Sequence, residues 1–188
     1  QHLDYHNRAQ ISELGYWFRD SELRVHSVHS PMFSDEAWGR SGPQAIINIT
    51  EPVKNKRIPM LDEIKRALEI AETVPYRYLV QHLGVVGQEF DERSMDVAFT
   101  ALEEISLFAR QRGVEVLLEN TPNGFSSAEG LLRFLEIDAG NGIDGFRQTF
   151  GMAAFKSDGD EVGIEDRIDL QGALQALHLA GVHHGRGV

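Results

Sequence analysis

Residues 76–119, YRYLVQHLGVVGQEFDERSMDVAFTALEEISLFARQRGVEVLLE, hold two short apolar runs on either side of a long amphipathic stretch. The runs Tyr76–His82 and Val114–Leu118 have the length and the β-branched or aromatic content of strands. Between them, residues 92–112 place apolar side chains at helical spacing, and Gly113 follows as a C-terminal cap. Two strands separated by one helix are typical of a parallel βαβ unit.

The same alternation extends toward the N-terminus. Residues 8–20 (RAQISELGYWFRD) predict a helix, and the alternating run Leu23–His29 predicts a strand. Residues 32–57 lack a clear period and predict one long loop. Pro59 then suits the first turn of a helix that runs to about Thr73.

The C-terminal part of the chain is less regular. Residues 126–136 predict a helix opened by a serine cap. Residues 137–188 are rich in glycine and contain no proline, and only a weak strand at Phe146–Phe155 and a helix at Ile168–Ala180 are indicated. We therefore divide the chain into 1–136 and a tail, 137–188, which is either a divergent domain end or an out-of-frame translation.

The element order α-β-α-β-α-β-α favours an α/β fold, either an open doubly wound sheet or a (β/α)₈ barrel. No glycine-rich phosphate-binding motif follows any of the three strands, which weakens the dinucleotide-binding alternative. A complete barrel takes about 250 residues. The predicted elements therefore correspond to a partial barrel, about half of one.

Composition excludes several classes of protein. The 188 residues carry a formal net charge of −11, which disfavours binding to nucleic acid. No apolar run reaches the roughly 20 residues that cross a bilayer, so no membrane segment is expected. The chain has no cysteine and no visible export signal, which makes the cytoplasm the default location. It begins at Gln1 without a methionine, so we expect its natural start to be missing.

Each predicted strand ends in a residue of metal-ligand type: His29, His82 and Glu119. The C-terminal ends of parallel strands point to one face, so these side chains are expected to converge. Two imidazoles and a carboxylate suit Zn²⁺, Mn²⁺ or Fe²⁺ and leave coordination positions open for water or substrate. The alternative is that each histidine is an ordinary structural residue at a strand end.

Three sequence segments carry a family resemblance: VHSVHSP at 25–31, LVQHLG at 79–84 and LLENTP at 117–122. In this order and spacing they resemble the xylose isomerase-like TIM barrels, over about residues 1–136. The superfamily contains sugar-phosphate isomerases and epimerases as well as DNA-repair enzymes of the endonuclease IV type. The resemblance implies a (β/α)₈ barrel with a divalent metal ion, Mn²⁺, Zn²⁺, Mg²⁺ or Co²⁺, at its C-terminal mouth.

The resemblance also implies roles for individual residues. His29, His82 and Glu119 match metal ligands of the endonuclease branch, and Glu119 alone matches a metal-binding acid/base glutamate of the epimerase branch. The family's D-T-G-H-type motif is absent after residue 136, and the first two strands also lack counterparts.

Three functions follow as alternatives. The first is a metal-dependent isomerase or epimerase of a sugar or sugar phosphate, in which Glu119 moves a proton through an enediolate. Asn120, Trp38 and Arg40 are its candidate substrate contacts, although packing within the loop explains Trp38 equally well. The second is an endonuclease IV-like phosphodiesterase, and the third is a non-enzymatic barrel module. Because a half barrel exposes its strand edges, we expect homo-oligomers and little turnover from the isolated chain.

Overall fold

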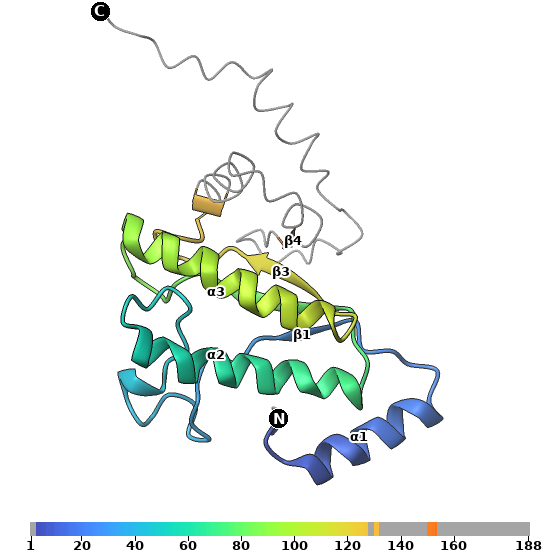
Figure 1. Cartoon of the computed structure of the whole chain (residues 1–188). Helices are drawn as coiled ribbons and strands as arrows, with labels where there is room; N and C mark the ends of the chain where they lie inside the picture. The colour runs from blue at the N-terminus through green and yellow to red at the C-terminus, as the bar shows by residue number, and fades with distance from the viewer. Residues whose placement is uncertain (1–2, 128–129, 132–149, 154–188) are drawn as a thin grey trace, which may run out of the picture. The chain divides into compact units, whose positions relative to one another are not determined.

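The computed structural model describes residues 3–127, 130–131 and 150–153, all of them within residues 1–153 of the chain. Helices and strands alternate along it, as Figure 1 shows. In chain order the elements are α1 (Arg8–Asp20), β1 (Ser27–His29), the 3₁₀-helix η1 (Pro43–Ala45), α2 (Lys54–Glu69), the 3₁₀-helix η2 (Ile70–Glu72), β2 (Tyr78–His82), α3 (Glu92–Arg110), β3 (Glu115–Glu119) and β4 (Phe150–Ala153).

The strands form one parallel sheet in the order β1-β2-β3-β4. Helix α2 lies in the connection from β1 to β2, and α3 lies in the connection from β2 to β3. The alternation of parallel strands and helices predicted from the sequence is therefore confirmed. Strand β4 falls within the predicted weak strand Phe146–Phe155 and pairs with β3, so part of the glycine-rich stretch contributes to the sheet.

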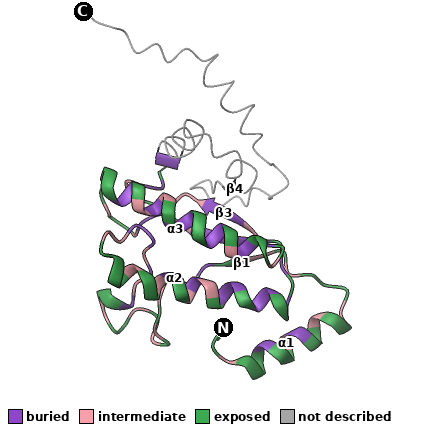
Figure 2. Cartoon of the chain, viewed as in Figure 1, coloured by how far each residue is buried: buried purple, intermediate pink, exposed green. Residues whose placement is uncertain are grey.

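The apolar core lies between the sheet and helices α2 and α3, which run side by side across one face of it (Figure 1). In Figure 2 both helices alternate between buried and exposed residues along their length, as amphipathic helices do. The fully buried side chains of this layer include Ile64, Leu68, Leu79, Leu102, Ile105 and Leu118.

The N-terminal segment is anchored to the same helical layer. The Tyr5 hydroxyl donates a hydrogen bond to Glu63 of α2 at 2.8 Å, and burial together with this bond raises the pKa of Tyr5. On α1, a Cβ added to Gly15 would lie 2.8 Å from Thr73 Cγ2, so only glycine permits this approach. Helix α1 therefore packs closely against the turn that precedes β2.

Strand β1 is shorter than the predicted strand Leu23–His29. Its pairing with β2 begins at Ser27, opposite Tyr78, and Leu23 is 58% exposed. Period-two alternation indicates an extended chain, but a strand also requires a neighbour. The first residues of the predicted run have none among the described strands.

Helix α2 begins at Lys54, which shortens the predicted loop 32–57 and places Pro59 inside the helix rather than in its first turn. The first turn closes on the carbonyl of Val53, which accepts hydrogen bonds from Lys56 and Arg57 at 3.0 Å. Pro59 is exposed and forgoes one backbone hydrogen bond. The helical conformation ends near Thr73 as predicted, because η2 continues directly from α2.

Of the helix predicted at 126–136, the structure describes residues 126–127 and 130–131, and the latter two are helical. Its serine cap is Ser127, whose hydroxyl accepts a hydrogen bond from the Gly130 amide at 3.1 Å. The predicted cap, Ser126, is therefore wrong by one residue, because its hydroxyl donates to the carbonyl of Leu83 at 2.9 Å. The helix predicted at Ile168–Ala180 lies outside the described residues.

Candidate metal centre

Strands β1, β2 and β3 each end in one of the predicted ligand residues. His82 is opposite Glu119 in the ladder, and His29 is opposite Val80, two residues before His82. Alternate residues of a strand share a face, so His29, His82 and Glu119 project from the same face of the sheet. This is the face turned away from the core beneath α2 and α3, as the absence of Val80 from that core cluster indicates.

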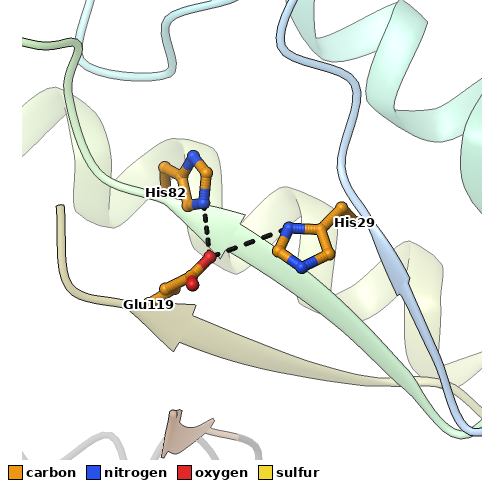
Figure 3. A group of neighbouring side chains, drawn as sticks. All are labelled: His29, His82 and Glu119. Carbon is orange, nitrogen blue, oxygen red and sulfur yellow. Dashed lines mark hydrogen bonds and ion pairs between the residues drawn. The ribbon is translucent and has the colours of Figure 1, made fainter. Parts of the chain in front are cut away.

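The two imidazoles meet at one carboxylate oxygen (Figure 3). His82 Nε2 lies 2.6 Å from Glu119 Oε2, and His29 Nδ1 lies 3.7 Å from the same atom. The ring centroids of the two histidines are 5.9 Å apart, with the rings inclined at 69°. The structure therefore brings together three residues that are widely separated in the sequence.

Burial differs among the three side chains. Glu119 is 13% exposed and His82 is 21% exposed, whereas His29 is 58% exposed. A carboxylate with so little access to water is costly unless it has a polar or charged partner. His82 provides the short contact, and His29 stands at the exposed edge of the group.

The donor set fits a divalent cation. One ligand atom from each residue lies within 4.8 Å of the other two. Ligand atoms bound at about 2.0–2.2 Å from Zn²⁺ lie about 3–3.5 Å apart, and the present distances of 2.6 and 3.7 Å to Glu119 Oε2 lie on either side of that spacing. Three protein ligands leave positions open, as in catalytic sites. Within the described residues, no second group of this kind occurs.

Gln81 is a neighbour of this group that sequence reasoning missed. Its Nε2 donates a hydrogen bond to the backbone carbonyl of His82 at 2.8 Å, and its side chain is buried on the helix-facing side of β2. The signal was present, because a glutamine that follows the apolar run YLV within a strand needs a buried polar partner.

The predicted substrate contacts lie on the loops that follow the ligand-bearing strands. Asn120 directly follows Glu119 and is half-buried. Trp38 and Arg40 are exposed residues of the long loop after β1, and Trp38 adopts a left-handed conformation with φ 58°. Their contact with substrate stays a prediction.

The turn that carries Trp38 is organised by Asp35. Its carboxylate accepts hydrogen bonds from the amides of Gly39 at 2.6 Å and Ser41 at 2.9 Å. Hydrogen bonding by Ser41 and by the Gly39 amide lowers the pKa of Asp35. These hydrogen bonds join Asp35, before Trp38, to two residues after it, so they span the left-handed residue. A left-handed backbone at a residue other than glycine is a form of local strain that concentrates at functional sites.

A family model described as a xylose isomerase-like TIM barrel matches residues 2–186 of the chain. Among solved structures, the chain is similar to a D-tagatose 3-epimerase-like protein, with 23% identity, a TM-score of 0.59 and coverage of 82% of this chain and 53% of that one. It is similar to an L-ribulose 3-epimerase, with 18% identity, a TM-score of 0.57 and coverage of 79% and 47%. A third similar structure is a Thermus thermophilus protein soaked with ZnCl₂, with 22% identity, a TM-score of 0.56 and coverage of 81% and 54%.

The chain spans about half the length of these solved structures. At such identities the likeness concerns the fold alone. No curated protein matches the sequence. In the described part of the chain, no helix combines the length and the apolar character needed to cross a membrane.

Proposed function

Because the chain belongs to the xylose isomerase-like TIM barrel family, we propose that it is a metal-dependent isomerase or epimerase of a sugar or sugar phosphate. The family resemblance and the barrel fold predicted from the sequence are confirmed by the family match. The observation that carries the proposal is that His29 and His82, at two strand ends, both approach the same carboxylate oxygen of Glu119 at a third. The sugar epimerases among the similar structures support the substrate class.

His29, His82 and Glu119 would hold the divalent ion, for which Mn²⁺, Zn²⁺, Mg²⁺ and Co²⁺ are the candidates. The ZnCl₂-soaked relative supports a metal of this class. When bound, the ion supplies polarisation of the substrate oxygens and stabilises the negative charge that develops as a proton leaves.

Glu119 is the proposed proton-transfer group. Proton removal from the carbon beside a carbonyl gives an enediolate, and the Glu119 carboxylate at the end of β3 would accept that proton. The His82 contact at 2.6 Å fixes the orientation of the carboxylate. Asn120, Trp38 and Arg40 are proposed to contact the sugar from the surrounding loops.

We also propose that the chain by itself turns over slowly or not at all. Inversion at a carbon needs a group that removes a proton from one face and another that returns a proton to the opposite face. Within the described residues, Glu119 is the only carboxylate of the ligand group. The outer edge of β1 is an edge of the described sheet, a feature that favours self-association.

The experiment has two arms, metal binding and turnover. Calorimetric titration of the metal-free chain with Zn²⁺, Mn²⁺, Co²⁺ and Mg²⁺ is expected to show one site, which Glu119→Gln removes. Ketose epimerisation is then assayed with each metal. Failure of all four metals to bind contradicts the metal-dependent function, and rapid epimerisation by the isolated chain contradicts the proposed low turnover.

A phosphodiesterase of the endonuclease IV type is the second candidate, favoured by the presence of both imidazoles beside Glu119. The net charge of −11 opposes it, because a DNA-binding face needs basic residues. Cleavage of abasic-site DNA by the metal-loaded chain, with no epimerisation of any ketose, would favour this candidate over the first.

A further inference from the structure

Polar side chains tie together the loops that follow β1, β2 and β3, the three strands that end in His29, His82 and Glu119. Gln88, in the loop after β2, bonds to the other two loops. Its side-chain amide reaches the loop after β1, and its backbone carbonyl accepts a hydrogen bond from Gly124, in the loop after β3, at 2.7 Å.

The side chains of Gln88, Thr50 and Asn48 close a ring of three hydrogen bonds. Gln88 Nε2 donates to Thr50 Oγ1 at 2.9 Å, Thr50 Oγ1 donates to Asn48 Oδ1 at 2.8 Å, and Asn48 Nδ2 donates to Gln88 Oε1 at 3.1 Å. Within the ring each side chain donates once and accepts once, which satisfies the single hydroxyl proton of Thr50. Gln88 Oε1 and Asn48 Oδ1 each accept one further hydrogen bond, from the amides of Val85 and Thr50 at 3.1 Å. Thr50 is fully buried, so loss of a partner here is not compensated by water.

The ring is connected to His29 through the loop after β1. Just beyond His29, the amide of Ile47 donates to the carbonyl of Met32 at 2.9 Å, and Phe33 forms an antiparallel bridge with Ile46. The segment that carries Asn48 and Thr50 is thus paired with the segment that leaves the end of β1.

The connection between the loops after β2 and β3 does not depend on the Gln88 side chain. Asn123 Nδ2 donates to the carbonyl of Leu83 at 2.8 Å, and the Ser126 hydroxyl donates to the same carbonyl at 2.9 Å. A Cβ added to Gly124 would lie 2.5 Å from the backbone nitrogen of Phe90, so these loops are in direct backbone contact. His82 and Glu119 are therefore held together by backbone groups and by Asn123 and Ser126.

We propose that Gln88 is a positioning residue that acts through Asn48 and Thr50 to keep His29 at coordinating distance from His82 and Glu119. His29 needs such support, because it ends a strand of three residues and is the most exposed of the three. The proposal rests on the metal site of the proposed function. It concerns His29, because removal of the Gln88 side chain leaves the link between the other two loops in place. In the loop after β2 the same removal costs only the hydrogen bond from the Val85 amide at 3.1 Å.

The test compares Gln88→Leu with Gln111→Leu, the same change at an exposed position after α3. In calorimetric titrations with Zn²⁺ we expect Gln88→Leu to bind about 10- to 100-fold more weakly than the wild type, the usual effect of losing a group that supports a ligand. Gln111→Leu is expected to bind as the wild type does.

The readout that separates positioning from general destabilisation is a double-mutant cycle with His29→Ala. If Gln88 acts through His29, Gln88→Leu has no further effect on Zn²⁺ affinity in the His29→Ala background. The proposal is overturned if Gln88→Leu weakens Zn²⁺ binding by the same factor in the wild-type and His29→Ala backgrounds. It is also overturned if Gln88→Leu leaves the Zn²⁺ affinity of the wild type unchanged. Thr50→Val removes the hydroxyl with little change in shape and is expected to repeat the pattern if Gln88→Leu does not fold.

A measurement without metal distinguishes failure of this proposal from failure of the proposed function. In NMR spectra of the metal-free chain, Gln88→Leu is expected to move the imidazole resonances of His29 and to leave those of His82 in place. A wild-type chain that binds no Zn²⁺ contradicts the function, whereas unmoved His29 resonances contradict the positioning role.

Discussion

On the helix-covered face of β2 and β3, Leu79, Val116 and Leu118 are at most 1% exposed and belong to the apolar core. On the opposite face of the same strands, Val80 is 5% exposed and lies outside that core cluster, and the strand then ends at His82. The two faces share one backbone, so a shift of register by one residue would exchange them. Burial of the apolar face therefore fixes the direction in which the ligand residues of the opposite face project.

The largest expected effect comes from the apolar face. Leu79→Ala should lower the free energy of unfolding by about 2–5 kcal/mol, because it removes buried methyl groups and leaves a cavity. Urea denaturation measures this loss. The control is Leu107→Ala on α3, where the side chain is 57% exposed and a change within about 0.5 kcal/mol is expected. Equal losses for the two variants would contradict the assignment of the core.

Glu119→Gln tests the opposite face. The amide keeps the size of the side chain and one acceptor oxygen but replaces the other oxygen with a donor and removes the charge, so the fold should persist. We expect Zn²⁺ affinity to fall by more than the roughly 10- to 100-fold that follows loss of a supporting group. Glu115→Gln, at the other end of β3, is the matched control and should bind metal like the wild type. Similar affinities for the two variants would remove Glu119 from the ligand set.

The two histidines should differ in their effect on stability. His82→Ala leaves the largely buried Glu119 carboxylate without its 2.6 Å partner, at a cost of about 1–3 kcal/mol. His29→Ala removes a side chain that is 58% exposed and lies 3.7 Å from the same oxygen, so its effect on unfolding should be smaller. Thermal denaturation of the two metal-free variants gives the order, and the reverse order would show that Glu119 depends on His29 instead.

The smallest effect is expected at the N-terminus of α3, the helix that covers the apolar face. The Asp91 carboxylate accepts a hydrogen bond from the Ser94 amide at 2.8 Å, and hydrogen bonding by Ser94 lowers the pKa of Asp91. Because the pKa of Asp91 is lower in the folded than in the unfolded state, the hydrogen bond to Ser94 stabilises the folded state above the ordinary aspartate pKa of about 4. It is lost as the pH falls below that value toward the folded pKa.

Melting temperatures at neutral and acidic pH measure the Asp91 effect. Asp91→Ala should melt below the wild type at pH 7, and the difference should shrink at acidic pH. Asp96→Ala, an exposed substitution within α3, should show no such cap effect. A difference between wild type and Asp91→Ala that stays constant with pH would show that the charge of Asp91 is not involved.

Local patterns predict the elements whose boundaries are set by neighbouring residues. Helix α1 has the predicted bounds, 8–20, because its apolar spacing and its cap at Asn7 lie in the same short segment. The strand predicted at Leu23–His29 is too long, because the first paired residue of β1 depends on where β2 begins, opposite Ser27. Pro59 gives a wrong start for α2 because its preference for a first turn is only statistical.

In the candidate site too, some features follow from the sequence pattern and others depend on contacts between distant residues. The convergence of His29, His82 and Glu119 could be predicted, because parallel strands bring their C-terminal ends to one edge of a sheet. The ring of Gln88, Thr50 and Asn48 could not, because Asn48 and Gln88 are 40 positions apart in loops without periodicity. Asparagine and glutamine are also not residue types that by themselves predict a metal or catalytic site.

Gly124 limits how the sequences of the loops after β2 and β3 can vary. Even a methyl group there would collide with the backbone at Phe90, so the loops after β2 and β3 tolerate change only if both move together. The loop after β1 is longer, and none of the residues in its middle, 35–42, is buried. Homologues that acquire new substrates on this fold should therefore diverge mainly in the loop after β1 and conserve the loops after β2 and β3.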